Sequence, residues 1–335
     1  MYRVRMLAAA AVLVVLAGVL AACGGKTEQL SKVRVGEVTR SIFYAPQYVA
    51  LSQGMFKQEG LEVELTTIPG GDKVATALLS GGIDVALVGA ETSIYVAQQG
   101  SSDPIVSFAQ LTQTDGTFLV ARKPVTNFDW NSLRGVTFLG QRKGGMPQMA
   151  GEFTLRKHGI DPQKDLNLIQ NIEFANIASA FASGTGDYVQ LFEPQASVFE
   201  KEGKGYVIAS FGKESGKLPY TDFMAKRSFM NKYPDTIQKY TNAIQRAQLW
   251  VQQKEVNEIA DAVKSFFPDT DIGIIRSVVQ RYKEQGSYAT DGIIDEEEWN
   301  NLKNVLRQAG ELKGDADYKM LVDNSFAEKA RTAVK

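Results

Sequence analysis

The sequence predicts an α/β protein with two similar lobes, each a mainly parallel sheet flanked by helices, joined by two hinge strands. Three observations predict this fold. Short apolar runs without polar alternation, which are typical of buried parallel strands, alternate with helical patterns along much of the chain. A short pattern of residues recurs further along the chain, and two extended apolar segments flank the second copy.

The composition is that of an ordinary globular protein. The chain has 335 residues, of which 44% are hydrophobic, and its formal net charge is −1. A chain of this length can bury one or two sizeable cores. Because the charges nearly balance, we expect neither a nucleic-acid partner nor a polybasic contact with a membrane surface.

The first residues have the pattern of a secretory signal. Arg3 and Arg5 precede an apolar run from Met6 to Ala22, which ends in small residues. We expect residues 1–22 to be a signal peptide and residues 23–32 to be a polar tether. An uncleaved membrane anchor is the alternative, because the run is at the short limit for crossing a bilayer.

Cys23 is the only cysteine, so no intrachain disulfide can form. The stretch LAAC that ends at Cys23 resembles the bacterial lipobox, in which the cysteine is lipidated and becomes the mature N-terminus. The resemblance implies that Cys23 is the lipidation site and that a lipid anchors the protein to the membrane. An idle cysteine after an apolar segment is the alternative.

The first copy of the repeated pattern contains three strands and two helices. We expect strands over Val33–Val38, Leu61–Ile68 and Ile83–Val88, and helices near Pro46–Gln53 and Asp72–Ser80. Proline suits a first helical turn, where its missing N–H has no partner to lose. An aspartate can cap the second helix, and the glycine pair that follows it can end it.

The second copy repeats the residues around the last helix and strand of the first. The recurring residues lie at one offset, with Ala77, Ser80, Gly81 and Asp84 matched by Ala180, Ser183, Gly184 and Asp187. The same offset carries the strand VRVGEV onto VTFLGQ. We therefore expect two lobes built from the same order of elements.

Segments between and after the copies suggest how the lobes connect. Thr117–Arg122 and Thr221–Lys226 are extended and apolar, and we interpret them as two strands that cross between the lobes. After them, helical patterns cover Pro234–Gln253, Val256–Phe266, Ile272–Glu284 and Glu296–Gln308. We expect residues 33–116 and 227–335 to form a discontinuous first lobe, and residues 117–226 to form the hinge strands and the second lobe.

The repeat also predicts a binding site. In open parallel sheets, ligands bind beyond the carboxyl ends of the strands, where helix N-termini offer unpaired N–H groups. Six loops are placed there, three in each lobe, and should face one cleft: Arg40–Ala45, Pro69–Asp72, Gly89–Thr92, Gln141–Pro147, Ile172–Ala175 and Phe192–Pro194. The GxxxxGK[ST] spacing of a nucleotide-binding loop is missing.

Glycine pairs, aromatic rings and polar groups in these loops are the candidate ligand contacts. The polar stretch 110–115, at the entrance to the hinge, adds further candidates. The set is Arg40, Phe43, Tyr44, Gly70, Gly71, Asp72, Glu91, Thr92, Thr112, Gln113, Lys143, Gly144, Gly145, Met146 and Glu193. For the two glutamates, helix capping or a structural ion pair is the alternative, and for the aromatic rings it is core packing.

Several runs match a known family. They are FYAPQYVALSQGMFKQEGLEVELTTIPGGDKVATALLSGGIDVALVG, GQRKGGMPQ, FEPQASVFEKEGKGYVIASFG and PYTDFMAKRSFM. From Val33 to about Gln253 the chain resembles the solute-binding lipoproteins of bacterial ABC importers, and among these the thiamine-precursor-synthase-like and sulfonate-binding group. The resemblance implies a periplasmic-binding-protein fold of the second type. It also implies an extracytoplasmic, lipid-anchored monomer that clamps a small molecule between its lobes and presents it to a membrane permease.

The same fold serves enzymes and sensors, which are the alternatives of another class. The related pyrimidine synthases use histidine and a cysteine-rich motif, whereas this chain has one histidine, His158, near the end of a predicted helix. No second histidine or spare thiol can complete a triad or a metal site. We therefore expect no catalytic residue, no metal site and no cofactor, and a tethered sensor stays open as an alternative.

The ligand class depends on which side chains reach the cleft. Two carboxylates with aromatic rings favour an aminopyrimidine-like heterocycle of the thiamine-precursor class, because carboxylates accept N–H bonds and rings stack. The rival is a sulfonate, taurine or another small oxyanion, held by backbone N–H groups together with Arg40, Arg142 and Lys143.

Overall fold

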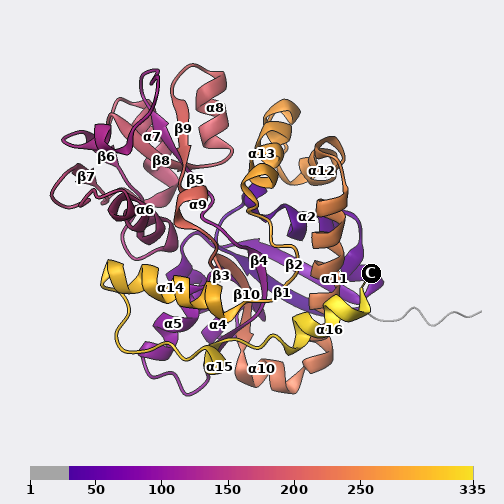
Figure 1. The fold of residues 1–335 in the computed structure, drawn as a ribbon. Helices are drawn as coiled ribbons and strands as arrows, with labels where there is room; N and C mark the ends of the chain where they lie inside the picture. The colour runs from indigo at the N-terminus through magenta and orange to yellow at the C-terminus, as the bar shows by residue number, and fades with distance from the viewer. Residues whose placement is uncertain (1–29, 335) are drawn as a thin grey trace, which may run out of the picture.

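The computed structural model describes residues 30–334, which form two five-stranded sheets with helices around them (Figure 1). The strands of the first sheet are β1 (Ser31–Glu37), β2 (Leu61–Thr67), β3 (Val85–Gly89), β4 (Ile105–Thr112) and β10 (Thr221–Lys226). Those of the second are β5 (Thr117–Ala121), β6 (Thr137–Leu139), β7 (Asn167–Ile169), β8 (Tyr188–Phe192) and β9 (Tyr206–Ser210). The predicted fold class is confirmed.

Both sheets have the same topology. Their strand orders are β2-β1-β3-β10-β4 and β7-β6-β8-β5-β9. Strand β10 is antiparallel to both its neighbours, and β5 is antiparallel to both of its own, so the other four strands of each sheet point the same way. The first three strands of each copy occupy equivalent positions, as the repeat predicts.

The two predicted hinge strands are present, but each belongs to one sheet. Strand β5 lies between β8 and β9, and β10 lies between β3 and β4. The chain crosses between the sheets just before each strand, through residues 113–116 and 211–220. The physical reason is pairing: buried apolar strands must satisfy their backbone groups on both sides, and only a sheet provides that.

Helices lie around both sheets. Those that follow the strands of the first sheet are η1 (Ile42–Tyr44), α2 (Ala45–Ser52), α3 (Met55–Gln58), α4 (Gly71–Leu79) and α5 (Glu91–Gln98). The corresponding elements of the second are η2 (Trp130–Leu133), α6 (Met146–Lys157), η3 (Phe174–Asn176), α7 (Ile177–Ala182), α8 (Gln195–Lys201) and α9 (Phe211–Ser215).

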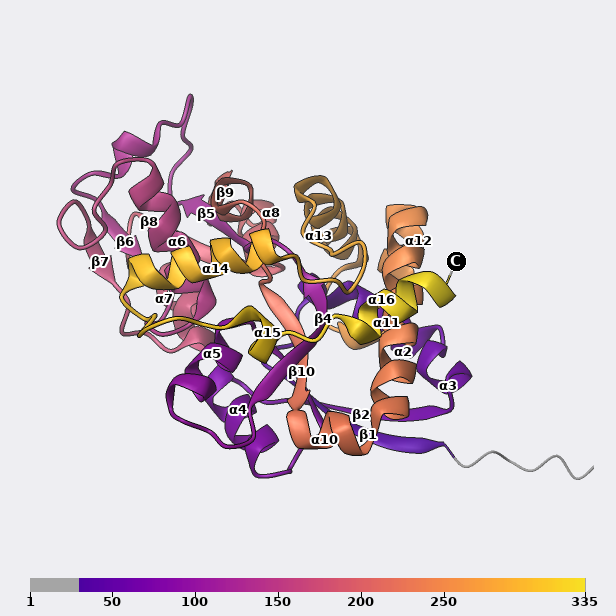
Figure 2. The same ribbon diagram turned by 60° about the horizontal axis from the view of Figure 1, so that its bottom comes forward.

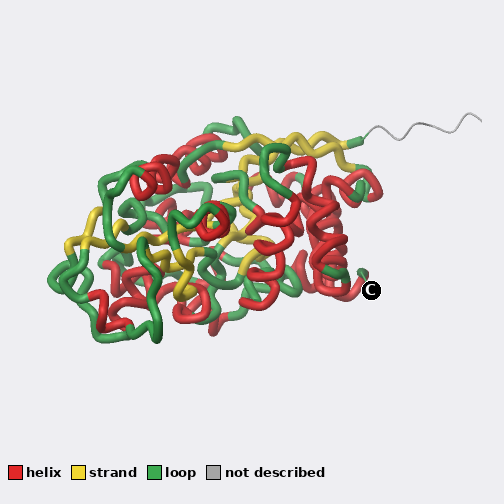
Figure 3. The backbone as a smooth tube through the Cα atoms, turned by 90° about the horizontal axis from the view of Figure 1, so that it is seen from above, coloured by secondary structure: helices red, strands yellow, loops and turns green. Residues whose placement is uncertain are grey.

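The C-terminal part of the described chain is helical and contacts both halves of the molecule. Its elements are α10 (Arg227–Lys232), α11 (Pro234–Gln253), α12 (Val256–Val263), η4 (Lys264–Phe266), α13 (Ile272–Gln285), α14 (Glu296–Ala309), α15 (Tyr318–Leu321) and α16 (Ser325–Ala333). Helix α11 packs on α2 and α16, whereas α14 packs on α6 of the second half (Figure 2). The view from above shows an elongated molecule with helices on both sides of the strands (Figure 3).

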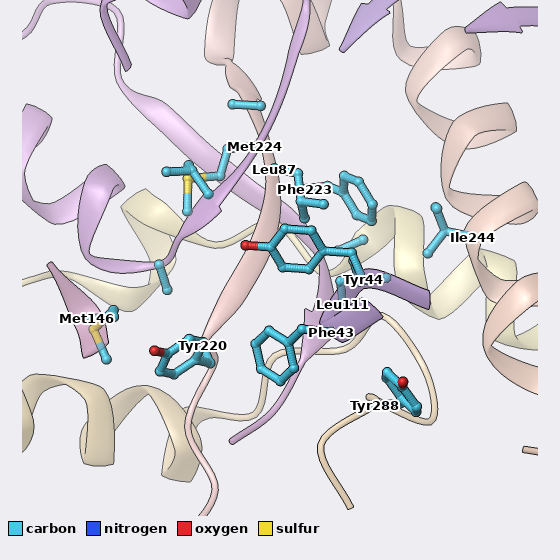
Figure 4. Close-up of a cluster of buried hydrophobic side chains, with 14 of the residues drawn as sticks. Phe43, Tyr44, Leu87, Leu111, Met146, Tyr220, Phe223, Met224, Ile244 and Tyr288 are labelled. Atoms are coloured by element: carbon cyan, nitrogen blue, oxygen red, sulfur yellow. The ribbon is translucent and has the colours of Figure 1, made fainter. Parts of the chain in front are cut away.

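One hydrophobic core continues across the boundary between the two halves. It contains Tyr44 and Leu87 from the first half together with Met146 and Leu191 from the second. Figure 4 shows part of it around the crossing segments. Within residues 30–334, no helix combines the length and the apolar character needed to cross a bilayer. The predicted signal peptide, Cys23 and most of the tether lie outside the described residues, and β1 already begins at Ser31.

Candidate functional site

The two halves meet through the first residues of α5 and α6. Glu91 begins α5, directly after β3, and Met146 begins α6, after β6. The Met146 backbone N–H donates to Glu91 Oε1 at 3.3 Å, whereas Glu91 Oε2 has no hydrogen-bond partner within residues 30–334. The Glu91 side chain is almost fully buried, and this burial raises its pKa from 4.5 to about 7.

A second buried carboxylate lies in the first crossing segment. Asp115 Oδ1 accepts hydrogen bonds from the backbone N–H of Thr117, at 2.6 Å, and from the Thr117 hydroxyl. Asp115 Oδ2 has no partner among the described residues. Burial raises the Asp115 pKa from 3.8 to about 6. The Tyr220 hydroxyl, from the second crossing segment, lies beside this carboxylate without a well-formed hydrogen bond in the described part of the chain.

Aromatic rings surround Phe43 at the same place. Its ring centroid lies 5.6 Å from Tyr220, 5.9 Å from Tyr44, 6.0 Å from Phe192 and 5.0 Å from Tyr282. Figure 4 shows the rings of Phe43, Tyr44 and Tyr220 together, with Met146 nearby. These rings come from both halves, so the crossing segments and the strand-end loops converge on one apolar and acidic region.

Gly116, next to Asp115, is fitted closely between two of these rings. A Cβ atom there would lie 2.8 Å from Phe43 Cζ and 2.9 Å from Phe192 Cε1. We expect Gly116→Ala to lower the free energy of unfolding by about 1–3 kcal/mol, because overpacking forces both rings to move. Urea unfolding measures the change. Gly145→Ala is the control, since its nearest heavy atom, Pro147 Cδ, is 3.5 Å away, and equal losses in both variants would contradict the tight fit.

The chemistry of this region is that of an acceptor site with flat apolar walls. Glu91 and Asp115 each offer one oxygen without a partner in the described chain. Carboxylates of this kind accept N–H bonds strongly, and aromatic faces attract rings and cations. These groups are chemically complementary to N–H groups or positive charge on a planar ring, whereas an anion would face two acidic groups.

The structure brings six predicted residues together in or beside this region: Phe43, Tyr44, Glu91, Thr92, Thr112 and Met146, all buried. The Glu91 carboxylate raises the pKa of the Tyr44 hydroxyl in addition to the larger effects of burial and Glu37. The Thr112 hydroxyl is buried without a partner in residues 30–334.

Other predicted residues lie nearer the surface, where helices α4 and α6 begin. Asp72 Oδ1, in the first turn of α4, is 3.7 Å from Arg142 Nη2 of the other half, and Arg142 Nη1 is 3.5 Å from Glu173 Oε1. The remaining residues near these helix starts are more accessible than the buried group, and they are Gly70, Gly71, Lys143, Gly144 and Gly145.

Three residues that were predicted to contact the ligand bind other protein groups in this structure. Arg40 Nε donates to Glu37 Oε1 at 3.2 Å, and the Gln113 side chain donates to the Gly286 carbonyl at 2.9 Å. Glu193 accepts bonds from Arg281 and from both the N–H and the hydroxyl of Ser197. Glu193 thus forms a structural ion pair, which is the alternative to ligand binding that the sequence left open for this residue.

Sequence reasoning missed Tyr220 and did not single out Asp115. Asp115 closes the polar stretch 110–115, from which only Thr112 and Gln113 were selected. The sequence signal for Asp115 is that this acidic residue is followed by a glycine immediately before an apolar strand. Tyr220 has no such signal, since nothing local distinguishes it from a core tyrosine.

His158 lies at a helix terminus, as the sequence predicts. It is the C-cap residue of α6, its ring stacks on Trp130 at 4.5 Å, and its Nε2 is 2.8 Å from Glu214 Oε2. In the part of the chain that the structure describes, no three His, Cys, Asp or Glu side chains gather in an arrangement that could hold a metal ion.

Comparisons with known proteins define the class. Residues 26–265 match the NMT1-like family, and the chain belongs to that family. The Bacillus subtilis (strain 168) protein described as "Putative binding protein YtlA" is 60% identical over 310 residues, which cover 92% of each chain.

Solved structures show the same fold. The nitrate-binding protein NrtA of Synechocystis PCC 6803 has a TM-score of 0.71 at 17% identity, covering 92% of this chain and 90% of its own. The aliphatic sulphonate-binding protein SsuA of Escherichia coli has a TM-score of 0.68 at 14% identity, covering 87% and 96%. This chain is thus of the type II periplasmic-binding fold. The Bacillus subtilis relative and these two solved structures are all described as binding proteins.

Proposed function

We propose that this protein delivers a small, amine-bearing aromatic heterocycle of the aminopyrimidine kind, the thiamine-precursor class, to a membrane permease. The observation that carries the proposal is a pair of buried carboxylates, Glu91 and Asp115, close to Tyr220, each with one oxygen that has no hydrogen-bond partner within residues 30–334. Their acceptor oxygens suit N–H groups on a heterocycle, and the aromatic side chains suit its faces.

The rival ligand is a sulfonate, taurine or another small oxyanion. Two structural neighbours are described as binding nitrate and aliphatic sulphonates. Electrostatics favour the heterocycle. The cations proposed for an anion are engaged or peripheral: Arg40 contacts Glu37, Arg142 lies between Asp72 and Glu173, and Lys143 is exposed. An anion beside Glu91 and Asp115 would require both to be protonated.

Uptake requires the lobes to close on the ligand. We propose that the lobes divide at the crossing segments 113–116 and 211–220, close to the predicted limits 33–116, 117–226 and 227–335. A ligand held by Asp115 in one crossing and Glu91 at the start of α5 contacts both a hinge and a lobe. It favours the closed state by its differential affinity, and a few kcal/mol are enough.

We also propose a cellular location for the protein, based on its first residues. A signal peptide over residues 1–22 and a lipid on Cys23 would hold the monomer outside the cytoplasmic membrane, next to its permease. Loss of ligand uptake on deletion of the gene supports transport, whereas loss of a signalling response with uptake intact would favour the tethered sensor.

The ligand proposal is tested by binding to the purified protein. We expect aminopyrimidines to raise the melting temperature and alkanesulfonates to leave it unchanged, because a ligand of the native state stabilises it by RT ln(1 + [L]/Kd). Glu91→Gln and Asp115→Asn should each weaken binding by roughly tenfold or more in calorimetric titrations, the loss of one charge-assisted hydrogen bond. The exposed Glu297→Gln is the control. Stabilisation by alkanesulfonates alone would reverse the assignment.

A further inference from the structure

Two helix N-termini from different halves of the molecule converge on one side chain. The eight-residue helix α5 begins at Glu91 itself, and the twelve-residue helix α6 begins at Met146, whose N–H donates to Glu91 Oε1. The N-cap residues, Ala90 and Gly145, form no side-chain cap. First-turn N–H groups lack intrahelical partners and carry a positive partial charge, so together these helices offer an anion site.

Glu91 is buried in that site. Its side chain is 6% exposed, and Oε2 has no hydrogen-bond partner within residues 30–334. Its own backbone N–H also contacts the carboxylate. The chain leaves room for this arrangement at Gly89, where a Cβ atom would lie 2.1 Å from Glu91 Oε2 and 2.6 Å from Oε1. The carboxylate therefore folds back over a glycine and occupies the space between the two helix ends.

We propose that the Glu91 side chain fills an oxyanion site between the lobes and thereby determines the specificity of the cleft. A small oxyanion entering the cleft would compete with Glu91 for the Met146 N–H and would be repelled by the carboxylate. A ligand with N–H groups meets the remaining oxygen, Oε2, as an acceptor. The inference deepens the proposed function, since the same side chain selects the heterocycle and excludes the oxyanion.

The consequence is that removal of the carboxylate should uncover an oxyanion site. Glu91→Ala empties the space, keeps a good helix former at the first position of α5, and leaves the Met146 N–H without its acceptor. Formate is the smallest carboxylate that can take the place of the lost group. Formamide is nearly the same shape without charge, and sodium chloride at equal concentration accounts for ionic strength.

The experiment is chemical rescue followed by thermal unfolding. We expect Glu91→Ala to melt below the wild-type protein and to recover by about 2–4 °C, saturably, with formate at about ten times its Kd. Formamide and sodium chloride should not reproduce that recovery. The wild-type protein, with its site filled, and Glu91→Gln, with its space filled, should show no specific response to formate. Glu297→Ala, which removes an exposed glutamate from α14, should behave like the wild-type protein.

The outcomes separate this inference from the proposed function. An equal response of wild type and Glu91→Ala to formate, or a response of Glu91→Ala to formamide, overturns the inference. Neither result involves the heterocycle, whose binding is measured separately on the wild-type protein. If Glu91→Ala does not fold, Glu91→Ser leaves a similar space with a polar group, and the same formate recovery is required of it.

Discussion

Replacing Arg281 with methionine is expected to lower the free energy of unfolding by about 3–5 kcal/mol at neutral pH, since it leaves a buried carboxylate unpaired. The Glu193 side chain is fully buried and accepts from Arg281 Nη1, while Arg281 Nη2 contacts Glu200 Oε2 at 2.6 Å. Burial raises the pKa of Glu193, and attraction to Arg281 limits that rise. Without the guanidinium the pKa rises further, so the loss should shrink as the pH falls and Glu193 takes up a proton.

Urea unfolding over a range of pH measures the loss of stability in Arg281→Met, and two further variants test whether the unpaired carboxylate causes it. The double variant Glu193→Gln with Arg281→Met should recover most of the loss, because an uncharged amide is less costly to bury than a lone carboxylate. Lys201→Met, on the neighbouring helix α8, removes the partner of Asp271 from a pair in which both side chains are more than half exposed. It should cost no more than about 1 kcal/mol. A loss in Arg281→Met no larger than that of Lys201→Met would show that the buried pair contributes little.

Local patterns in the sequence were enough to locate the main elements of the fold. The helix predicted over Pro234–Gln253 is observed with those limits, because proline at its start and an apolar stripe define it. The predicted helix over Val256–Phe266 continues as a 3-10 helix after Val263. The repeat indicated only that β1, β2 and β3 correspond to β6, β7 and β8, and the order of the strands within each sheet comes from the structure.

In the candidate site, too, local sequence patterns located some residues, whereas others meet only because of how the chain folds. Glu91 and Met146 follow strand ends, so the repeat placed them at the boundary between the lobes. Asp115 and Tyr220 lie in the crossing segments, and their meeting depends on the route of the chain between the two sheets. The partner of Glu193 is Arg281, which lies 88 residues further along the chain on α13. No local pattern links residues at such a separation, and the pairing is decided when α13 packs on α8.

Exchange of Glu91 for glutamine is expected to change how stability depends on pH, by about 3 kcal/mol between pH 4.5 and pH 7. The Glu91 pKa is 4.5 as an ordinary side chain and about 7 in the folded protein, because burial disfavours the charged form. Between these values the folded state holds a proton that the unfolded state has released. Stability therefore falls as the pH rises through this window. Glutamine cannot titrate and still offers an oxygen to the Met146 N–H, so this part of the decline should vanish.

Asp115→Asn should remove a second decline of similar size at lower pH, between about 3.8 and 6, because burial raises the Asp115 pKa to about 6. The quantity to compare is the difference from wild type at each pH, since the other carboxylates of the chain titrate alike in all variants. Glu297→Gln, at an exposed position, is the control variant. A difference for Glu91→Gln that stays constant over this pH range would mean that its carboxylate is solvated in the folded protein. An acceptor site for N–H groups would then lose its physical basis, because an exposed carboxylate adds little to the binding of a small ligand. A difference that grows with pH would show that the protein keeps a costly buried acid at the boundary between its lobes, and such a cost is characteristic of a group retained for binding.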